Sequence, residues 1–424
     1  MTTDIVGSKA NGCDDLSALR GLISVDHAIA KGLKIASRVT EREDVPLLDA
    51  VGRILADDLT APMPLPPFDN SGMDGYALRS ADLQGRGPWV LQVAGRIAAG
   101  DDITAIVPIQ PGNAYRIFTG AAVPVGLDAV IMQEHVTRKD DTIHIDRSVP
   151  AGNNIRRVGE DAAKGSLLLR AGTLIGAREI GALASVGLSC VSVRRKVNIA
   201  LFCTGSELRQ PGENLAPGQI YNSNRYMMLA TLKMPWANVI DFGSVADDPD
   251  RLRHTLTKAA KAADIVVTTG GVSVGEEDHM FSQLKRAGGK VEVVKIAMKP
   301  GKPLTMGSLL GAVFIGLPGN PVAAYTTWKI IGSQIATKAA GLVAGDISRT
   351  LVETTSASTR RPGRREFRPA RIVAVAKSGR LKVELLDKSF SAKISLICNS
   401  DGFAVIPAEQ DTIRKGECLE FIYL

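Results

Sequence analysis

The sequence has 424 residues and a formal net charge of +7 at pH 7. This length exceeds what one hydrophobic core usually organises, so we expect about two to four domains. The composition is 45% hydrophobic and 22% charged, which is ordinary for a globular protein, and only 4% aromatic, which predicts mainly aliphatic cores.

The first 20 residues are polar and contain glycine, so we expect a loose extension and no leader peptide. Residues 25–39 carry apolar side chains at helical spacing behind Ser24, a suitable N-cap. The segment APMPLPPFDNSGMDGYAL follows, and its dense prolines exclude a helix interior or a central strand. It predicts an extended segment that leads into a turn-rich loop.

Residues 76–150 consist of short apolar or alternating runs, such as WVLQVAG, AYRIFTG and DAVIMQEHV, broken by Gly, Pro and Asp. This pattern predicts a β-rich module. Residues 151–194 contain NNIRRVGED and KGSLLLRAGTLIG, and we expect a helix over 177–187.

From Lys196 apolar runs typical of buried strands alternate with helical patterns. The runs are VNIALFC, ANVIDFGSV, ADIVVTTGG, VEVVKIA and GAVFIGL. One helix should begin at Asp248 and Pro249, and another behind Asn320. The alternation predicts a mostly parallel sheet with helices on both faces, a three-layer α/β domain. After about Ala344 the helical pattern stops, and RIVAVAKSGRLKVELL predicts a hairpin within a small β-barrel or sandwich.

Five cysteines lie far apart, at Cys13, Cys190, Cys203, Cys398 and Cys418. Their odd number and spacing indicate reduced thiols and a cytoplasmic location. No C-x-x-C or H-E-x-x-H pattern occurs, so no zinc site is expected. No uninterrupted run of about 18 apolar residues occurs, so we expect no membrane span. The mild basic excess fits an anionic substrate, nucleic acid or no partner, but no nucleic-acid motif is present, so we expect no nucleic-acid partner.

Three strand-to-loop transitions share a glycine-rich character: CTGSE at 203–207, TTGGVSVGEED at 268–278 and GLPGNP at 316–321. Loops of this kind gather at the carboxyl ends of parallel strands, where helix N-termini suit phosphate. A single glycine-rich loop occurs in any α/β fold, but three in one domain favour a phosphate-type ligand. None is a Walker A or G-x-G-x-x-G sequence.

Acidic residues lie at or near these loops: Glu207, Asp247, Asp248, Glu276, Glu277 and Asp278. Hard oxygen ligands beside phosphate suit Mg²⁺. Each acid taken alone, however, fits a helix cap or a solvated charge better than a metal ligand, Asp248 above all. The KIAMKPGKP segment places Lys295, Lys299 and Lys302 close together. These lysines either clamp an oxyanion or form a solvated loop.

Two further segments differ from ordinary loops. FDNSGMDGYA combines two acids with apolar neighbours, so we interpret it as a functional loop. The only dense basic stretch is interpreted as a solvated loop and strand edge; it contains Arg360, Arg361, Arg364, Arg365, Arg368 and Arg371.

Seven segments, in this order, resemble the molybdopterin molybdenumtransferase family, which includes the bacterial MoeA proteins and the gephyrin E-domain. They are PPFDNSGMDGYA, RIFTGAAVP, NIRRVGED, ALFCTGSEL, TTGGVSVGEED, KPGKP and GLPGNP. The similarity runs from about Val25 to the helix after GLPGNP and is weaker beyond it. One segment alone would be a weak signal, but seven in family order are specific.

The resemblance implies a transferase of molybdenum cofactor biosynthesis. Such an enzyme inserts molybdenum from molybdate into adenylylated molybdopterin and releases AMP, with Mg²⁺ or a similar divalent cation. It also implies a homodimer in which the α/β domain of one subunit faces the β-rich domain of the other. The adenylyltransferase of the same pathway is a further expected partner. We expect a loose extension (1–20), a linker and dimerisation domain (21–73 and 156–194), an inserted β-rich domain (74–155), an α/β molybdopterin-binding domain (195–345) and a C-terminal β-barrel (346–424).

The resemblance also assigns roles to residues at matching positions. The catalytic positions are Asp74, Glu207, Asp247 and Asp278, of which Glu207 and Asp278 would bind the metal. The substrate-binding positions are Thr119, Arg156, Asp161, Gly270, Gly271, Ser273, Lys295, Lys299, Pro318 and Pro321. Ser206 departs from the family because many relatives carry an acid there, which weakens this loop as a metal site.

Two other functions compete with this assignment. A molybdopterin adenylyltransferase uses only the α/β domain, so the long N-terminal half and the β-rich C-terminus argue against it. A scaffold protein on the same fold is the second alternative, and the acids at Asp74, Glu207 and Asp278 favour catalysis instead.

Overall fold

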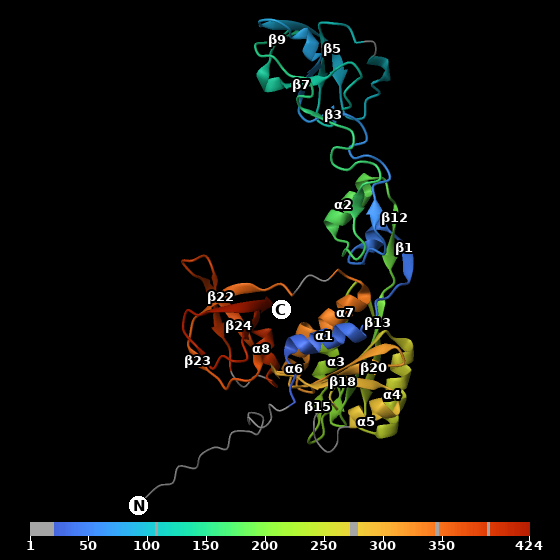
Figure 1. The fold of residues 1–424 in the computed structure, drawn as a ribbon, viewed down its shortest axis with the longest axis vertical. Helices are drawn as coiled ribbons and strands as arrows, with labels where there is room; N and C mark the ends of the chain where they lie inside the picture. The colour runs from blue at the N-terminus through green and yellow to red at the C-terminus, as the bar shows by residue number, and fades with distance from the viewer. Residues whose placement is uncertain (1–20, 107–108, 272–278, 344–346, 388–390) are drawn as a thin grey trace, which may run out of the picture.

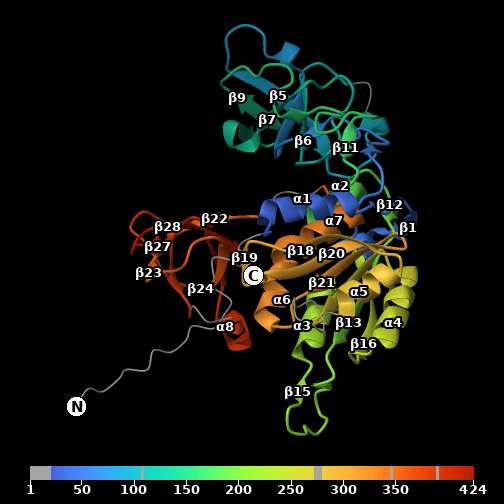
Figure 2. The ribbon, with the colours of Figure 1, turned by 60° about the horizontal axis from the view of Figure 1, so that its bottom comes forward.

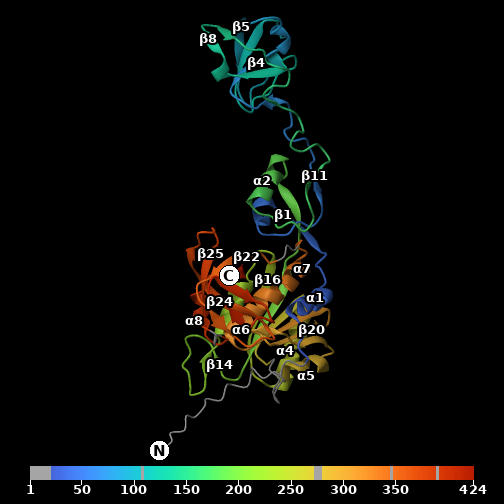
Figure 3. The same cartoon turned by 60° about the vertical axis from the view of Figure 1, so that its left-hand side comes forward.

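A computed structural model describes residues 21–106, 109–271, 279–343, 347–387 and 391–424. The chain forms an elongated arrangement, with a β-rich module at one end, a narrow two-way connection, and an α/β domain beside a C-terminal barrel at the other (Figures 1 and 3). Within the described residues, no helix is both long and apolar enough to cross a membrane.

The α/β domain is built on one six-stranded sheet. In spatial order its strands are β16 (Ala237–Val245), β13 (Val197–Thr204), β17 (Ile265–Thr269), β21 (Ala312–Leu317), β20 (Pro303–Leu309) and β18 (Lys290–Lys295). The first four are parallel, whereas β20 and β18 join by antiparallel pairing. The predicted mostly parallel sheet is therefore confirmed.

Strand β20 was not among the expected strands. It precedes β21 through a two-residue turn, Leu310–Gly311, in which both residues have positive φ, 51° and 92°. Such a turn matches the twist of paired strands and is usually signalled by Asn-Gly or Asp-Gly. Because Leu310 occupies this position, the sequence carries no recognisable hairpin-turn signal here.

Helices cover both faces of the sheet (Figure 2). One face carries α1 (Val25–Ile35), α3 (Ser223–Leu232), α6 (Pro321–Thr327), the π-helix η6 (Trp328–Gly332) and α7 (Ser333–Ala340), and the other carries α4 (Pro249–Ala262) and α5 (His279–Arg286). Alternate residues of each central strand enter opposite cores: in β13, Leu201 packs with the first group of helices and Phe202 with the second. This period of two explains why the strands are apolar throughout.

The expected helix starts are confirmed. The Ser24 side chain accepts from the His27 N–H at 3.1 Å and caps α1. The Asp248 side chain accepts from the Arg251 N–H at 2.8 Å and caps α4, whose first residue is Pro249. Asn320 occupies the N-cap position of α6, but its side chain makes no capping hydrogen bond.

The connection to the β-rich module consists of two passes of chain that pair with each other. Three outgoing strands pair with three returning ones: β1 (Arg42–Pro46) with β12 (Cys190–Arg194), β2 (Leu59–Thr60) with β11 (Leu167–Leu169), and β3 (Asn70–Ser71) with β10 (Ile155–Arg156). Helix α2 (Ala177–Ser185) packs beside the turn η2 (Leu47–Ala50). The expected helix over 177–187 is confirmed.

The β-rich module between these passes contains a second six-stranded sheet. Its strands, in spatial order, are β7 (Ala129–Met132), β4 (Gly75–Leu78), β6 (Asn113–Ile117), β5 (Trp89–Ile97), β9 (Thr142–Ile145) and β8 (Thr137–Lys139). Short helical turns interrupt it: η3 (Ser80–Asp82), η4 (Thr104–Ile106) and η5 (Gln133–His135).

At the C-terminus five strands close into a barrel: β24 (Arg365–Val375), β25 (Leu381–Leu385), β22 (Thr350–Thr354), β28 (Cys418–Tyr423) and β26 (Gly402–Ile406), which pairs back with β24. A short pair, β23 (Ser358–Thr359) with β27 (Thr412–Ile413), and helix α8 (Ile394–Cys398) complete it. The predicted barrel is confirmed, as is the hairpin between β24 and β25.

The interpretation of the basic stretch as a solvated loop and strand edge is wrong for two of its arginines. The side chains of Arg360 and Arg368 are only 2% and 1% exposed, and both contact the buried carboxylate of Glu366. A buried carboxylate compensates buried guanidinium groups, a pairing that a run of basic letters does not reveal.

The close contact between β4 and β7 predicts how glycine substitutions affect the stability of the β-rich module. A Cβ added to Gly75 would lie 1.9 Å from the Ile131 carbonyl oxygen, whereas one added to Gly95 in the same sheet would meet only the Tyr115 ring at 3.4 Å. We expect Gly75→Ala to destabilise the module by about 1–3 kcal/mol because backbone must shift. Gly95→Ala should change its stability by less than about 0.5 kcal/mol. Hydrogen exchange of peptides from the module measures both, and equal protection in the two variants would contradict the packing described.

Candidate functional site

The carboxyl ends of the four parallel strands define a pocket of about 530 Å³. Thr204 ends β13, Thr269 ends β17, and Pro318 follows β21, while Asp247 lies just beyond β16. These ends are adjacent because Thr204 is in register with Val245, and Thr269 with Leu317. The pocket therefore lies where ligands bind in open parallel sheets.

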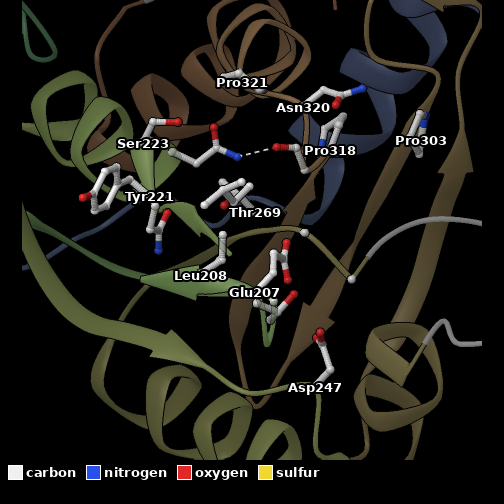
Figure 4. Close-up of a pocket in the computed structure, with 18 residues that line it drawn as sticks. Glu207, Leu208, Tyr221, Ser223, Asp247, Thr269, Pro303, Pro318, Asn320 and Pro321 are labelled. Carbon is white, nitrogen blue, oxygen red and sulfur yellow. Dashed lines mark hydrogen bonds between the residues drawn. The ribbon is translucent and has the colours of Figure 1, made fainter. Parts of the chain in front are cut away.

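Six of the predicted site residues line this pocket: Glu207, Asp247, Gly270, Gly271, Pro318 and Pro321. Figure 4 shows Glu207 near the centre of the pocket and Asp247 at its edge, with the Asp247 side chain directed toward Glu207. Pro318 and Pro321 form the opposite side, at the start of α6. The loops CTGSE, TTGG and GLPGNP thus meet at one place, as expected.

Glycine is required where two of these loops approach each other. Gly270 has φ +88°, and a Cβ there would lie 2.5 Å from the Thr204 carbonyl oxygen. Gly271 has φ +63°, and a Cβ there would lie 2.9 Å from Thr204 Oγ1. L side chains rarely adopt such backbone, so the pocket floor is bare backbone that a ligand can approach closely.

The two acidic side chains are available to a ligand. Among the described residues, the Glu207 carboxylate takes part in no hydrogen bond or ion pair, and Asp247 accepts a single long hydrogen bond, 3.3 Å, from the Ser206 N–H. No group of three or more His, Cys, Asp or Glu in the described part of the chain is placed to hold a metal ion. Two carboxylates nevertheless match Mg²⁺, which usually takes one or two carboxylates and completes its coordination with phosphate and water.

The structure adds pocket residues that the sequence analysis missed. The Asn222 side chain is buried and caps α3 by accepting from the Arg225 N–H at 3.0 Å. The Asn224 amide donates to the Gly319 carbonyl at 2.6 Å and so ties α3 to the GLPGNP loop across the pocket (Figure 4). An asparagine before a helical pattern is an N-cap signal, and it could have placed this helix start at the strand ends.

A buried thiol lies behind the pocket. Cys203 accepts a hydrogen bond from Thr269 Oγ1 at 3.1 Å, and burial raises the pKa of its thiol. A protonated, inaccessible thiol is a poor nucleophile. Cys203 is therefore a packing residue here.

Lys295 and Lys299 do not line the pocket. Lys295 ends β18, in register with Pro303, which does line it. Lys299 lies on the short strand β19 (Met298–Lys299), which pairs with β24 of the barrel, and its ammonium lies 3.7 Å from the Glu366 carboxylate. Within the KPGKP segment, Pro303 therefore lines the pocket, whereas Lys299 contacts the barrel.

Four predicted residues lie far from the pocket. Asp74 and Thr119 belong to the β-rich module, and Arg156 and Asp161 lie on the returning pass of the connection. Figure 1 places this end of the molecule opposite the α/β domain. Within one chain the structure does not bring these residues together with Glu207 and Asp247.

Asp74 and Thr119 form a local pair. The Thr119 N–H and hydroxyl both donate to Asp74 Oδ1, each at 2.8 Å. These hydrogen bonds, the backbone one first, lower the pKa of the Asp74 carboxyl. Nearby, Asp69 accepts from Val158 N–H and pairs with Arg157, so it holds the FDNSG loop against the returning pass.

Asp278 and Ser273 lie outside the described residues, as do the neighbouring acids Glu276 and Glu277. Of the two acids expected to bind the metal, the structure therefore describes Glu207 alone.

Comparison with known proteins covers nearly the whole chain. Residues 23–187 match the MoeA N-terminal region (domain I and II), residues 200–338 a probable molybdopterin binding domain, and residues 352–424 the MoeA C-terminal region (domain IV). The Haemophilus influenzae protein named molybdopterin molybdenumtransferase is 35% identical over 398 residues, 93% of this chain and 97% of that protein. Molybdopterin molybdenumtransferase 2 of Mycobacterium tuberculosis is 37% identical over 334 residues, 77% of this chain and 82% of that protein.

A solved structure shows the same fold. The molybdopterin biosynthesis MoeA protein from Pyrococcus horikoshii OT3 superposes with a TM-score of 0.81 at 28% identity, covering 95% of this chain and 100% of that one.

The Asp74–Thr119 pair makes a pH prediction. Because the folded pKa of Asp74 is lowered, its pairing stabilises the fold above the ordinary aspartate pKa of about 3.9. That contribution is lost as the pH falls through the folded pKa. Thr119→Val removes the hydroxyl donor and keeps the N–H donor, so the pKa of Asp74 should rise but stay below its ordinary value. A ¹³C-carboxyl NMR titration measures this shift.

Asp102 is the matched control for this titration. Its pKa is lowered in the same way, by hydrogen bonds from Thr104 in the same module. It should titrate identically in wild type and Thr119→Val, and an unchanged Asp74 pKa in the variant would contradict the pairing.

Proposed function

This chain belongs to the MoeA family of molybdopterin molybdenumtransferases, and we propose that it inserts molybdenum from molybdate into adenylylated molybdopterin with release of AMP. It acts in molybdenum cofactor biosynthesis as a transferase. The observation that carries the mechanism is the pocket in which Glu207 and Asp247 face the backbone of three glycine-rich loops. Matches to the MoeA N- and C-terminal regions argue against an adenylyltransferase, which needs only the α/β domain.

The pocket suits a phosphate-containing substrate beside a divalent cation. The ten-residue helix α3 begins at the pocket, so its free N–H groups and positive dipole end favour a phosphoryl group there. Glu207 and Asp247 would hold Mg²⁺ or a similar cation. When bound, this cation would stabilise negative charge on the phosphoanhydride that is cleaved.

The remaining assigned residues would shape the pocket or supply positive charge at its border. The rigid Pro318–Pro321 loop and the Asn224–Gly319 hydrogen bond shape the side of the pocket opposite the acids. Lys295 and Lys299, which lie beyond Pro303, would neutralise phosphate or molybdate as compact charges. Asp278 and Ser273 belong to this proposal by their position in the TTGGVSVGEED segment.

The proposal includes a homodimer. Four assigned residues, Asp74, Thr119, Arg156 and Asp161, belong to the β-rich module and the returning pass, which lie at the other end of the molecule from their own chain's pocket. A second copy that presents its β-rich module would supply these residues to the site. The exposed Asp74 carboxylate, ionised and oriented by Thr119, would then face the ligand. A cytoplasmic location and delivery of substrate by the adenylyltransferase of the pathway complete the proposal.

Substitutions of Glu207 and Asp247 test whether the pocket acids act in catalysis, and Asp248, which lies outside the pocket, serves as the control. We expect Glu207→Gln and Asp247→Asn to lower molybdate-dependent AMP release by roughly a hundredfold or more, since each removes a charge that serves the transition state. Asp248→Asn should keep nearly full activity, because asparagine caps α4 as well as aspartate does.

The assay follows AMP release from adenylylated molybdopterin with Mg²⁺ and molybdate, together with reconstitution of a molybdenum-free apo-enzyme. Tight substrate binding without turnover by the wild-type protein would favour a scaffold protein. Full activity in Asp247→Asn would remove this pocket from the mechanism.

Mixing two inactive variants tests the shared site. Asp74→Ala and Glu207→Ala should each be inactive alone. Re-associated at equal amounts, half of the dimers should contain one intact site of two, which restores about a quarter of wild-type activity. No recovery in heterodimers whose formation is verified by mass spectrometry would show that Asp74 and Glu207 serve the same chain.

A further inference from the structure

A buried carboxylate lies at the boundary between the α/β domain and the C-terminal barrel. Glu366 lies at the start of β24 and is completely buried. Its Oε1 accepts from Arg368 Nε at 2.6 Å, and its Oε2 lies 3.0 Å from Arg360 Nε. The Lys299 ammonium approaches the same Oε2 at 3.7 Å. Three cations therefore share one carboxylate.

The backbone sets this arrangement. β19 pairs in parallel with β24, so that Lys299 is directly in register with Glu366. The Arg365 N–H donates to the Ala297 carbonyl at 2.9 Å, and the Arg365 guanidinium forms two hydrogen bonds of 2.8 Å with Asp26 of α1. The KPGKP segment is thus held between the two domains, and its first lysine, Lys299, lies beside the barrel.

The two arginines are fixed independently of Lys299. Arg360 donates to the carbonyls of Pro407 and Gln410 at 2.7 and 2.8 Å. Arg368 donates to Ser358 Oγ at 2.8 Å. Both side chains are buried, whereas Lys299 is 28% exposed. Lys299 is therefore the least buried of the three cations that surround Glu366.

Lys299 is held by charge and not by a well-aligned hydrogen bond. Among the described residues, Glu366 Oε2 has no hydrogen-bond partner of acceptable geometry, although two cations lie within ion-pair distance of it. In a buried setting such a charge interaction is strong. Without the carboxylate, Arg360 and Arg368 would repel the lysine toward solvent.

We propose that Glu366 is a positioning residue: it holds the Lys299 ammonium in place for the anionic substrate and balances the two arginines behind it. This inference rests on the proposed function, in which Lys299 neutralises molybdate or phosphate. It makes the C-terminal barrel part of the substrate site through a residue that does not touch the substrate.

A double-mutant cycle tests this coupling. The variants are Glu366→Gln, Lys299→Gln and the double variant, and the readout is the molybdate concentration that gives half-maximal AMP release. Each single change should raise that concentration about tenfold, and the double change should raise it no further than Lys299→Gln alone. The maximal rate should fall much less than the affinity for molybdate.

Lys295→Gln is the matched control, because Lys295 lies in the same KIAMKPGKP segment and is not among the described contacts of Glu366. In the double variant with Glu366→Gln, the fold-changes of the two single variants in the half-maximal molybdate concentration should multiply. If the Lys299 and Glu366 effects also multiply, or if Glu366→Gln leaves the molybdate dependence unchanged, Glu366 does not act through Lys299 and the proposal is overturned.

Folding is controlled by a second variant, since a neutral residue at 366 leaves buried cations without a partner. Glu366→Asp keeps the charge but withdraws it by one methylene, so it should fold, as circular dichroism and melting temperature will show, and still weaken the molybdate dependence. A folded Glu366→Asp with wild-type molybdate dependence also overturns the proposal. Absence of molybdate-dependent AMP release in the wild-type protein would instead contradict the proposed function itself.

Discussion

The parallel pairing of β13 with β16 and β17, and of β17 with β21, is the constraint on which the site depends. Parallel strands end at the same edge, so loops separated by more than a hundred residues of chain meet there. The inner strands β13, β17 and β21 are almost completely buried because helices cover both faces of the sheet. Glu207, Asp247, Gly270 and Pro318 are neighbours for this reason alone.

The second determinant is the length of the paired connection. Chain passes that pair strand by strand, β1 with β12 and β3 with β10, hold the β-rich module away from the α/β domain. The module orients Asp74 through two hydrogen bonds from Thr119, yet Asp74 does not line the pocket at the strand ends of its own chain. An acid that is ionised, oriented and exposed at the far end of a molecule makes physical sense when a second copy receives it.

The third determinant is the interface between the α/β domain and the barrel. A buried carboxylate is costly unless it is paired and hydrogen-bonded. Glu366 meets that requirement with Arg360 and Arg368, and the same charge extends to Lys299. The position of Lys299, which lies on β19 outside the pocket lining, therefore depends on the interior of a neighbouring domain.

Much of this molecule was predictable from local sequence. Ser24 and Asp248 predicted helix starts because an N-cap is a local interaction, and VNIALFC predicted a central strand because burial on both faces demands an apolar run. The glycine-rich loops predicted the pocket edge. The hairpin at Leu310–Gly311 was not predicted from the sequence, because leucine is an unusual residue for positive φ.

Only the tertiary structure decided which residues of the site share one place. It placed Glu207 with Asp247, added Asn222 and Asn224, and separated Asp74 from both. It also showed that Arg360 and Arg368 are buried against Glu366, where the sequence suggested a solvated stretch. Local patterns report hydrogen bonds and burial within a few residues, whereas the pairing of charges across domains depends on contacts between distant parts of the chain.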